Sequence, residues 1–174
     1  MAEATNRQLV EFCSEMRITL STAESCTGGL LGSLITDVPG ASKCYLGGIV
    51  AYSNRSKTEL LGVKPGTIAG YGAVSSEVAI EMAQGCIERF GSTIAVSITG
   101  ISGPSGGTEV KPVGTAYIAV AGGGLENDCQ GLVLGPVDRG RFKISSTQKA
   151  LSMLMGRANM VIHGGERNGP GLSA

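Results

Sequence analysis

Apolar residues recur along the chain with two different periods, and the two periods alternate. Spacings of three and four residues predict long helices, over about residues 5–17, 27–37, 75–90 and 138–160. Short runs of β-branched and small apolar residues predict strands, over 18–23, 44–52, 93–99, 112–121 and 129–134. This alternation predicts an α/β fold, a three-layer α/β/α sandwich with a mixed, mostly parallel central sheet.

Turn residues assign the remaining segments. Residues 55–61 are expected to form a short helix that Asn54 caps and Gly62 ends. The segment 63–74 holds Pro65 and several glycines, which predicts a loop. The run 93–99 is almost continuously apolar, so this strand is expected to be buried on both faces of the sheet.

The organisation of the chain is that of one domain. No composition shift, repeat or low-complexity tract interrupts residues 1–163, and the Gly-rich residues 164–174 are expected to form a flexible tail. No apolar run reaches the ~18 residues of a membrane-spanning helix, and no apolar signal segment follows Met1. We therefore expect a cytoplasmic protein with no membrane partner.

Composition excludes several function classes. Fourteen basic residues balance fourteen acidic ones and aromatic residues make up 4%, so neither a basic field nor a stacking platform for nucleic acid is expected. Five cysteines, an odd number without a C-x-x-C motif, predict free thiols. His163 is the single histidine, which argues against a zinc site and a Ser-His-Asp triad. We expect no metal and no cofactor.

The first candidate site is the segment Ala23-Glu24-Ser25-Cys26-Thr27-Gly28-Gly29, between a predicted strand and a predicted helix. Such a turn lifts a serine to the carboxyl edge of a sheet and directs backbone N–H groups at an anion. Ser25 is therefore a candidate nucleophile, although a helix-capping role is the alternative. Cys26 is a second possible nucleophile, but we expect it to pack in the core because no histidine lies near it.

Lys57 is the candidate base for Ser25, with Tyr52 as a proton relay. A lysine accepts a proton only when it is neutral, so burial or nearby positive charge must lower its pKa from ~10.4. Arg55 and the Leu60-Leu61 pair are expected to supply these two effects. From spacing alone, a solvated Lys57 on a surface helix remains the alternative.

Two further segments suit an anion. The Gly100–Thr108 loop, followed by Lys111, offers backbone N–H groups and a charge; a plain turn between strands is the alternative. Arg139 and Arg141, near the start of the last helix, can form a phosphate clamp; two solvated surface arginines are the alternative.

Five blocks together resemble one known family. They are Ala23–Gly29, Val50-Ala51-Tyr52-Ser53-Asn54-Arg55-Ser56-Lys57, Gly72-Ala73-Val74-Ser75, Ser97-Ile98-Thr99-Gly100-Ile101-Ser102-Gly103-Pro104 and Lys111-Pro112-Val113-Gly114-Thr115. In this order, over about residues 7–160, the chain is similar to the CinA C-terminal domain family, whose stand-alone members include the PncC-type nicotinamide-nucleotide amidases.

The resemblance implies the sandwich fold and hydrolysis of nicotinamide mononucleotide (NMN) to nicotinic acid mononucleotide and ammonia. It implies Ser25 as nucleophile, assisted by Tyr52 and Lys57, without metal, and it suggests a homodimer or higher homo-oligomer. Residues of the blocks and of the last helix are expected to contact the substrate: Thr27, Gly28, Gly29, Asn54, Thr99, Gly100, Gly103, Gly106, Gly107, Lys111, Arg139 and Arg141.

Two departures limit what the resemblance implies. Ser105 stands where family members often carry an acidic residue. Larger members also carry an N-terminal molybdopterin-binding-like domain, so ADP-ribose pyrophosphatase activity is not expected here. A non-catalytic nucleotide-binding module and a competence or DNA-damage module are the alternative functions.

Overall fold

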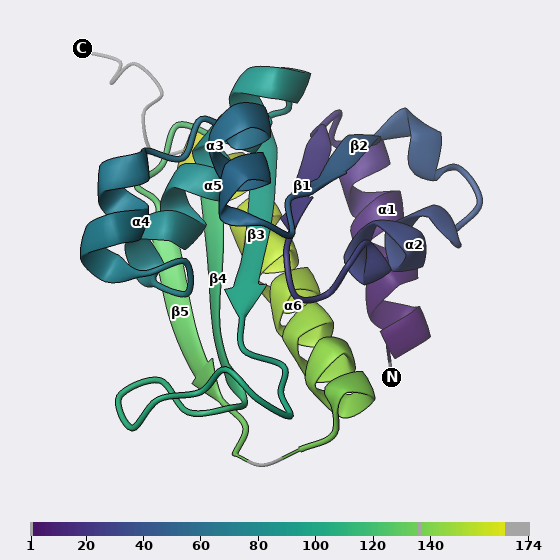
Figure 1. Cartoon of the computed structure of the whole chain (residues 1–174). Helices are drawn as coiled ribbons and strands as arrows, with labels where there is room; N and C mark the ends of the chain where they lie inside the picture. The colour runs from purple at the N-terminus through teal and green to yellow at the C-terminus, as the bar shows by residue number, and fades with distance from the viewer. Residues whose placement is uncertain (1, 136, 166–174) are drawn as a thin grey trace, which may run out of the picture.

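The computed structural model describes residues 2–135 and 137–165. Five strands form one sheet in the order β2-β1-β3-β4-β5 (Figure 1). The strands are β1 (Leu20–Glu24), β2 (Tyr45–Val50), β3 (Ile94–Gly100), β4 (Thr115–Gly122) and β5 (Asp128–Val133). The helices are α1 (Ala2–Glu15), α2 (Leu30–Thr36), α3 (Asn54–Leu61), α4 (Pro65–Tyr71), α5 (Ser76–Phe90) and α6 (Arg139–Gly165), with a 3-10 turn, η1 (Ala41–Lys43).

The sheet is mixed. Strand β1 pairs in parallel with β2 and with β3, whereas β4 pairs antiparallel with β3 and with β5. Strand β4 therefore runs against the other four strands. The predicted α/β sandwich around a mixed sheet is confirmed, but only two of the four strand pairings are parallel, because β4 and β5 form an antiparallel hairpin.

Helices cover both faces of the sheet. One apolar cluster joins α1, α2 and α6 to one face, and two smaller clusters join α3 and α5 to the other. Strand β3 lies between the layers: Ile94 and Val96 belong to the first cluster and Ala95 to the second, all three fully buried. The expectation that this strand is buried on both faces is confirmed.

Helix α3 begins one residue earlier than expected. The N-cap is Ser53, not Asn54: the Ser53 hydroxyl accepts from the backbone N–H of Ser56, and the Ser56 hydroxyl accepts from the N–H of Ser53. This reciprocal capping box satisfies two donors, whereas Asn54 satisfies neither. Gly62 ends the helix as predicted, with a φ of 68°.

The segment 63–74 is not a continuous loop, because α4 lies within it. Pro65 occupies the first turn of this helix, where a missing N–H has no cost. The Glu81 carboxylate of α5 accepts hydrogen bonds from the Lys64 N–H and the Thr67 hydroxyl, each at 2.8 Å. A side chain from a neighbouring helix therefore holds the start of α4.

Helix α3 packs very closely on α5. Gly85 of α5 faces Leu61 of α3, and a Cβ atom on Gly85 would overlap the Leu61 carbonyl group. Only a glycine permits this separation of the two backbones. The close packing fixes the position of α3, the helix that carries Lys57.

Helix α6 ends the described part of the chain. It includes Gly164 and Gly165, where the flexible tail was expected to begin, and residues 166–174 of that tail lie outside the described residues. Asp138 caps the start of this helix, with Oδ1 accepting from the Arg141 N–H at 2.9 Å. No helix among residues 2–135 and 137–165 is long and apolar enough to span a membrane.

Candidate active site

A small pocket lies where β1, β2 and β3 end. The chain leaves β1 toward β2 on one side and β3 lies on the other, and such switch points at carboxyl ends form ligand crevices in open α/β sheets. The pocket has a volume of about 150 Å³. Its lining residues lie at or after the ends of the three strands or just before α5: Ser25, Cys26, Tyr52, Asn54, Lys57, Ala73, Val74, Thr99, Gly100 and Ser102.

Ser25 is the first residue after β1, and its position is fixed by both neighbouring strands. Its N–H donates to the Ile98 carbonyl of β3 at 3.0 Å, and the Ala51 N–H after β2 donates to the Glu24 carbonyl at 2.8 Å. The Ser25 side chain is buried and its Oγ lies 2.9 Å from the Nζ of Lys57. The structure thus brings the expected nucleophile and base into contact.

Lys57 reaches this position from α3 and is 2% exposed. Its Nζ also donates to the carbonyl oxygens of Ala51 at 3.1 Å and Tyr52 at 3.4 Å. An ammonium group would donate to all three oxygens. A neutral amine would donate to the two carbonyls and direct its lone pair at the Ser25 hydroxyl, which is the arrangement that a base requires.

The environment of Lys57 favours its neutral form. Burial lowers the pKa of Lys57 from its ordinary value of 10.5, and the nearby Cys26 opposes this in part. Arg55 does not contribute as expected, because it points to the surface and pairs with Glu59 at 2.7 Å. Desolvation, the second of the two expected effects, is therefore the cause of the shift.

The turn after Ser25 contains a capping carboxylate that sequence reasoning missed. Buried Glu24 accepts hydrogen bonds at 2.9–3.1 Å from three backbone N–H groups at the start of α2: Gly29, Leu31 and Gly32. The Gly28 N–H donates to the Ser25 carbonyl at 3.1 Å. The N–H groups of Gly28 and Gly29 are therefore occupied within the protein.

Two other N–H groups of this turn lack an oxygen acceptor within the described protein. The backbone N–H groups of Cys26 and Thr27 donate to no oxygen of another described residue. Both lie close enough to the Cys26 sulfur to lower the pKa of its thiol, an effect that burial outweighs. They are the donors next to Ser25 that could bind a developing oxyanion.

Cys26 itself is a core residue. Burial raises the pKa of its thiol to about 12, and the side chain packs in the cluster beneath α2 and α6. A thiol with this pKa remains protonated at neutral pH and is a poor nucleophile. The environment supports the expectation that Cys26 packs in the core.

Tyr52 contacts Lys57 through its backbone rather than its ring. The side chain is 63% exposed, and its hydroxyl accepts from Nη1 of Arg139 at 3.5 Å. Arg139 also donates through Nη2 to the Gly103 carbonyl at 2.8 Å. The Tyr52 hydroxyl makes no hydrogen bond to Ser25 or Lys57 in the described structure, so its relay role stays a prediction.

The glycine-rich loop before β4 packs mainly on itself. Lys111 donates from Nζ to the Tyr71 carbonyl at 2.7 Å, and its backbone bonds to Thr108. A Cβ on Gly107 would lie 2.6 Å from the backbone nitrogen of Val113. Gly100 lines the pocket, whereas four other expected contacts do not: Gly103, Gly106, Gly107 and Lys111.

Asn54 and Thr99, two more of the residues predicted to contact substrate, line the pocket. The Thr99 hydroxyl donates to the Ala73 carbonyl at 2.8 Å, which ties the end of β3 to the start of α5. Sequence reasoning gave no role to Ala73, Val74 or Ser102, although each lies inside one of the blocks that carried the family resemblance.

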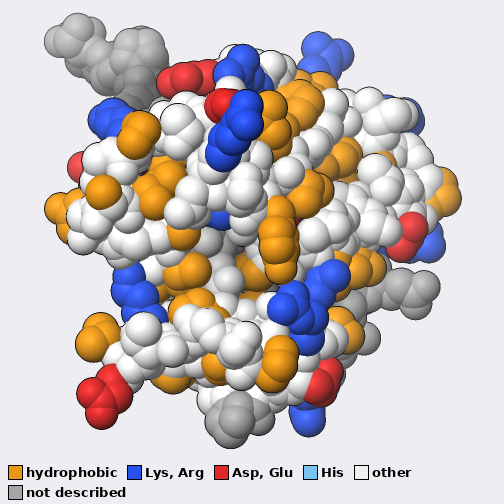
Figure 2. Space-filling view, viewed as in Figure 1, with side chains coloured by type: hydrophobic (Ala, Val, Ile, Leu, Met, Phe, Trp, Pro, Cys, Tyr) orange, Lys and Arg blue, Asp and Glu red, His pale blue; other side chains and the backbone are white. Residues whose placement is uncertain are grey.

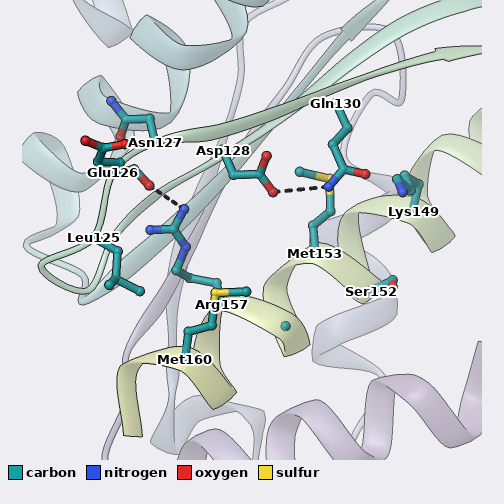
Figure 3. A pocket seen from close by; sticks show the side chains of 11 residues that line it. Leu125, Glu126, Asn127, Asp128, Gln130, Lys149, Ser152, Met153, Arg157 and Met160 are labelled. Atoms are coloured by element: carbon teal, nitrogen blue, oxygen red, sulfur yellow. Dashed lines mark hydrogen bonds between the residues drawn. The ribbon is translucent and has the colours of Figure 1, made fainter. Parts of the chain in front are cut away.

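Basic side chains lie on both sides of a hollow on the face shown in Figure 2. A larger hollow of about 430 Å³ lies elsewhere, between α6 and the β4–β5 turn (Figure 3). There the buried Arg157 donates to the carbonyls of Val120, Gly122 and Glu126 and so holds the hairpin on α6.

No group of three His, Cys, Asp or Glu side chains able to hold a metal occurs among the described residues.

Comparison with known proteins identifies the family. The model of the CinA C-terminal domain matches residues 2–158. The chain belongs to the CinA C-terminal domain family. A "CinA-like protein" of Chlorobaculum tepidum is 50% identical over 153 residues, 86% of this chain and 36% of that protein. A "putative competence-damage inducible protein" of Acetivibrio thermocellus is 57% identical over 60% of this chain and 25% of that protein.

Solved structures of this family share the fold. The competence/damage inducible protein CihA from Agrobacterium tumefaciens superposes with a TM-score of 0.88 at 34% identity, covering 90% of this chain and 94% of that one. A CinA superfamily protein from Escherichia coli gives 0.84 at 32% identity, with 89% of each chain covered. The chain spans about a third of the length of the first curated relatives it matches.

Proposed function

We propose that the chain is a serine amidohydrolase that converts NMN to nicotinic acid mononucleotide and ammonia. The observation that carries this proposal is the buried contact of 2.9 Å between Ser25 Oγ and Lys57 Nζ. A buried serine in contact with a lysine whose pKa is lowered is the arrangement of an activated nucleophile. The family resemblance supplies the substrate.

In the first half-reaction, Lys57 accepts the Ser25 proton while Oγ attacks the carbon of the nicotinamide amide. The oxygen of the tetrahedral intermediate receives hydrogen bonds from the N–H groups of Cys26 and Thr27. The Lys57 ammonium then gives its proton to the amide nitrogen. The C–N bond breaks, ammonia leaves, and the nicotinoyl group remains as an ester on Ser25.

In the second half-reaction, water replaces ammonia. Neutral Lys57 accepts a proton from the water as its oxygen attacks the ester carbon, and then returns the proton to Ser25 as the ester bond breaks. Nicotinic acid mononucleotide leaves and the enzyme is restored. One base serves both half-reactions, which agrees with a single lysine at the pocket.

Ammonia release tests the proposal. Purified protein should release one ammonia for each NMN converted, with and without EDTA, and Ser25→Ala protein should release none. Nicotinic acid mononucleotide should be the product by chromatography. Wild-type protein that releases no ammonia from NMN, although it is folded, would refute the proposal.

A second candidate is a non-catalytic module associated with competence or DNA damage, which the names of the relatives favour because they mention competence and damage induction. Calorimetric titration with NMN separates the two functions. Binding without ammonia release would support the module. The buried contact between Ser25 and Lys57, whose pKa burial lowers, favours the enzyme.

A further inference from the structure

One lysine near the pocket has no role in the chemistry above. Lys143 is half-buried on α6, and a Cβ atom on Gly28 would lie 3.8 Å from its Nζ. The ammonium group therefore lies beside the turn that follows Ser25. Within residues 2–135 and 137–165, the side chain of Lys143 makes no hydrogen bond or ion pair.

Arg139 is a second cation on the same side of α6. Residues four apart on a helix lie on one face, and Arg139 precedes Lys143 by four. Its guanidinium contacts two uncharged acceptors, the Tyr52 hydroxyl and the Gly103 carbonyl. Like charges at this spacing destabilise a helix unless an anion compensates them, and no described acidic side chain pairs with either residue.

The other basic candidates lie elsewhere. Arg141 follows Arg139 by two residues, which places its side chain about 200° around the helix. It is exposed, and its backbone N–H is bound to Asp138. Lys111 donates to the Tyr71 carbonyl across the loop. Neither residue can act together with Arg139 on one ligand group without leaving its present position.

We propose that Arg139 and Lys143 form a clamp for the phosphate of a nucleoside monophosphate, with Lys143 as a specificity-determining residue. This inference rests on the proposed function, because the reacting amide is placed at Ser25. A pocket of about 150 Å³ is smaller than the ~300–1,000 Å³ of typical ligand sites. It seats the reacting ring, and the ribose phosphate extends over the rim toward α6.

Two cations fit a phosphate better than a carboxylate. A phosphate monoester carries up to two negative charges near neutral pH and three acceptor oxygens. Arg139 offers a planar fork of donors and Lys143 a point charge, so together they match both the charge and the number of oxygens. A carboxylate would be satisfied by Arg139 alone.

Calorimetry in the Ser25→Ala background, which prevents turnover, tests the clamp. Lys143→Gln should weaken NMN binding about tenfold and leave nicotinamide riboside, which lacks the phosphate, unchanged. Lys143→Arg should restore most of the affinity. Lys149→Gln is the matched control, because Lys149 also lies on α6 but lines the hollow of Figure 3, and it should bind both ligands as the parent does.

A second probe separates this proposal from the amidase proposal. Ribose 5-phosphate should raise the melting temperature of the wild type more than ribose does, and Lys143→Gln should abolish the difference. If Lys143→Gln abolishes the difference between the two sugars while the wild type does not hydrolyse NMN, the clamp proposal is supported and the amidase proposal is refuted. If NMN is hydrolysed but Lys143→Gln weakens the binding of NMN and of nicotinamide riboside equally, or weakens neither, the clamp proposal is refuted and the amidase proposal is supported.

Discussion

Two segments of this chain look alike in sequence and differ in structure. Residues 25–29 and residues 101–114 are both rich in glycine and hydroxyl side chains, and both follow a strand of the sheet. The first presents two backbone N–H groups beside the Ser25–Lys57 contact. The second bonds to itself and is tied to the end of α4 by Lys111. Glycine content predicted anion binding for both, but the hydrogen-bond partners distinguish them.

The difference has a physical origin. The first segment is short, and Glu24 satisfies the start of α2, so the turn is fixed without using the N–H groups nearest Ser25. The second segment is long and must satisfy many backbone groups of its own. A loop of that kind folds on itself, and its glycines permit close packing such as that of Gly107 on Val113. We expect the first segment to carry the chemistry and the second to act as scaffold.

The strongest test of this contrast is at Ser25. Ser25→Ala should lower kcat for NMN by roughly 10⁴- to 10⁶-fold, because Ser25 is the pocket hydroxyl that contacts the proposed base, Lys57. Cys26→Ser is the matched control, since the buried thiol has only a packing role, and it should retain most activity. Steady-state ammonia release measures both, and a larger loss in Cys26→Ser would make the thiol the nucleophile.

Lys57 gives the next largest effect. Lys57→Arg keeps a positive charge but cannot deprotonate near neutral pH, so kcat should fall by roughly 10²- to 10⁴-fold, almost as far as in Lys57→Ala. Wild-type activity should decrease as the pH falls below the lowered pKa of Lys57, because the amine then becomes charged. A pH–rate profile checks this. Substantial turnover in Lys57→Arg would show that another group is the base.

Substitutions on α6, the helix beside residues 25–29, should have a smaller effect, on NMN affinity. Arg139→Ala should weaken NMN by about ten- to a hundredfold relative to nicotinamide riboside, because its guanidinium lies at the pocket rim beside Tyr52. The sequence pattern predicted the same for Arg141, but Arg141 lies on another face of α6, so Arg141→Ala should change both ligands little. Titration of the two variants compares them directly, and equal effects would contradict the assignment by helix face.

The smallest effect is expected in the second segment. Lys111→Met removes the hydrogen bond to the Tyr71 carbonyl but no expected substrate contact, so KM for NMN should rise less than about threefold. Limited proteolysis should cut the loop faster than in the wild type. A rise in KM of more than tenfold for NMN, without a change for nicotinamide riboside, would show that this loop binds the phosphate and would contradict its role as scaffold.

Periodicity predicted the strands and the long helices because their apolar positions repeat locally. It missed α4, because Glu81 of another helix holds the start of that helix and no local pattern records such a contact. The sequence predicted Asn54 as the N-cap of α3, whereas the structure has Ser53. Both residue types are good caps, and only the hydrogen bonds with Ser56 decide between them.

In the site too, local patterns predicted some features and tertiary contacts determined the others. Local sequence patterns made Ser25, Lys57 and Tyr52 candidates, and the family resemblance implied that they act together, since residues 32 apart cannot be paired from spacing alone. The direction of the Tyr52 ring and the occupied N–H groups of Gly28 and Gly29 depend on tertiary hydrogen bonds. The spacing of four residues between Arg139 and Lys143 already indicated that both lie on one face of a helix. Only the fold shows that this face lies beside the turn at Gly28.

Gly85 bears on how activity is inferred across relatives of this chain. It does not line the pocket, yet a side chain there would push Leu61 and therefore α3 away from α5. Lys57 travels with α3, so its amine would move away from Ser25 while every catalytic residue type remained in the sequence. Under the proposed function, a homologue with a larger residue at this position and an unchanged α3–α5 packing would match the motifs and lack activity. Inspection of position 85 together with the motif residues would then help to tell active members from inactive ones.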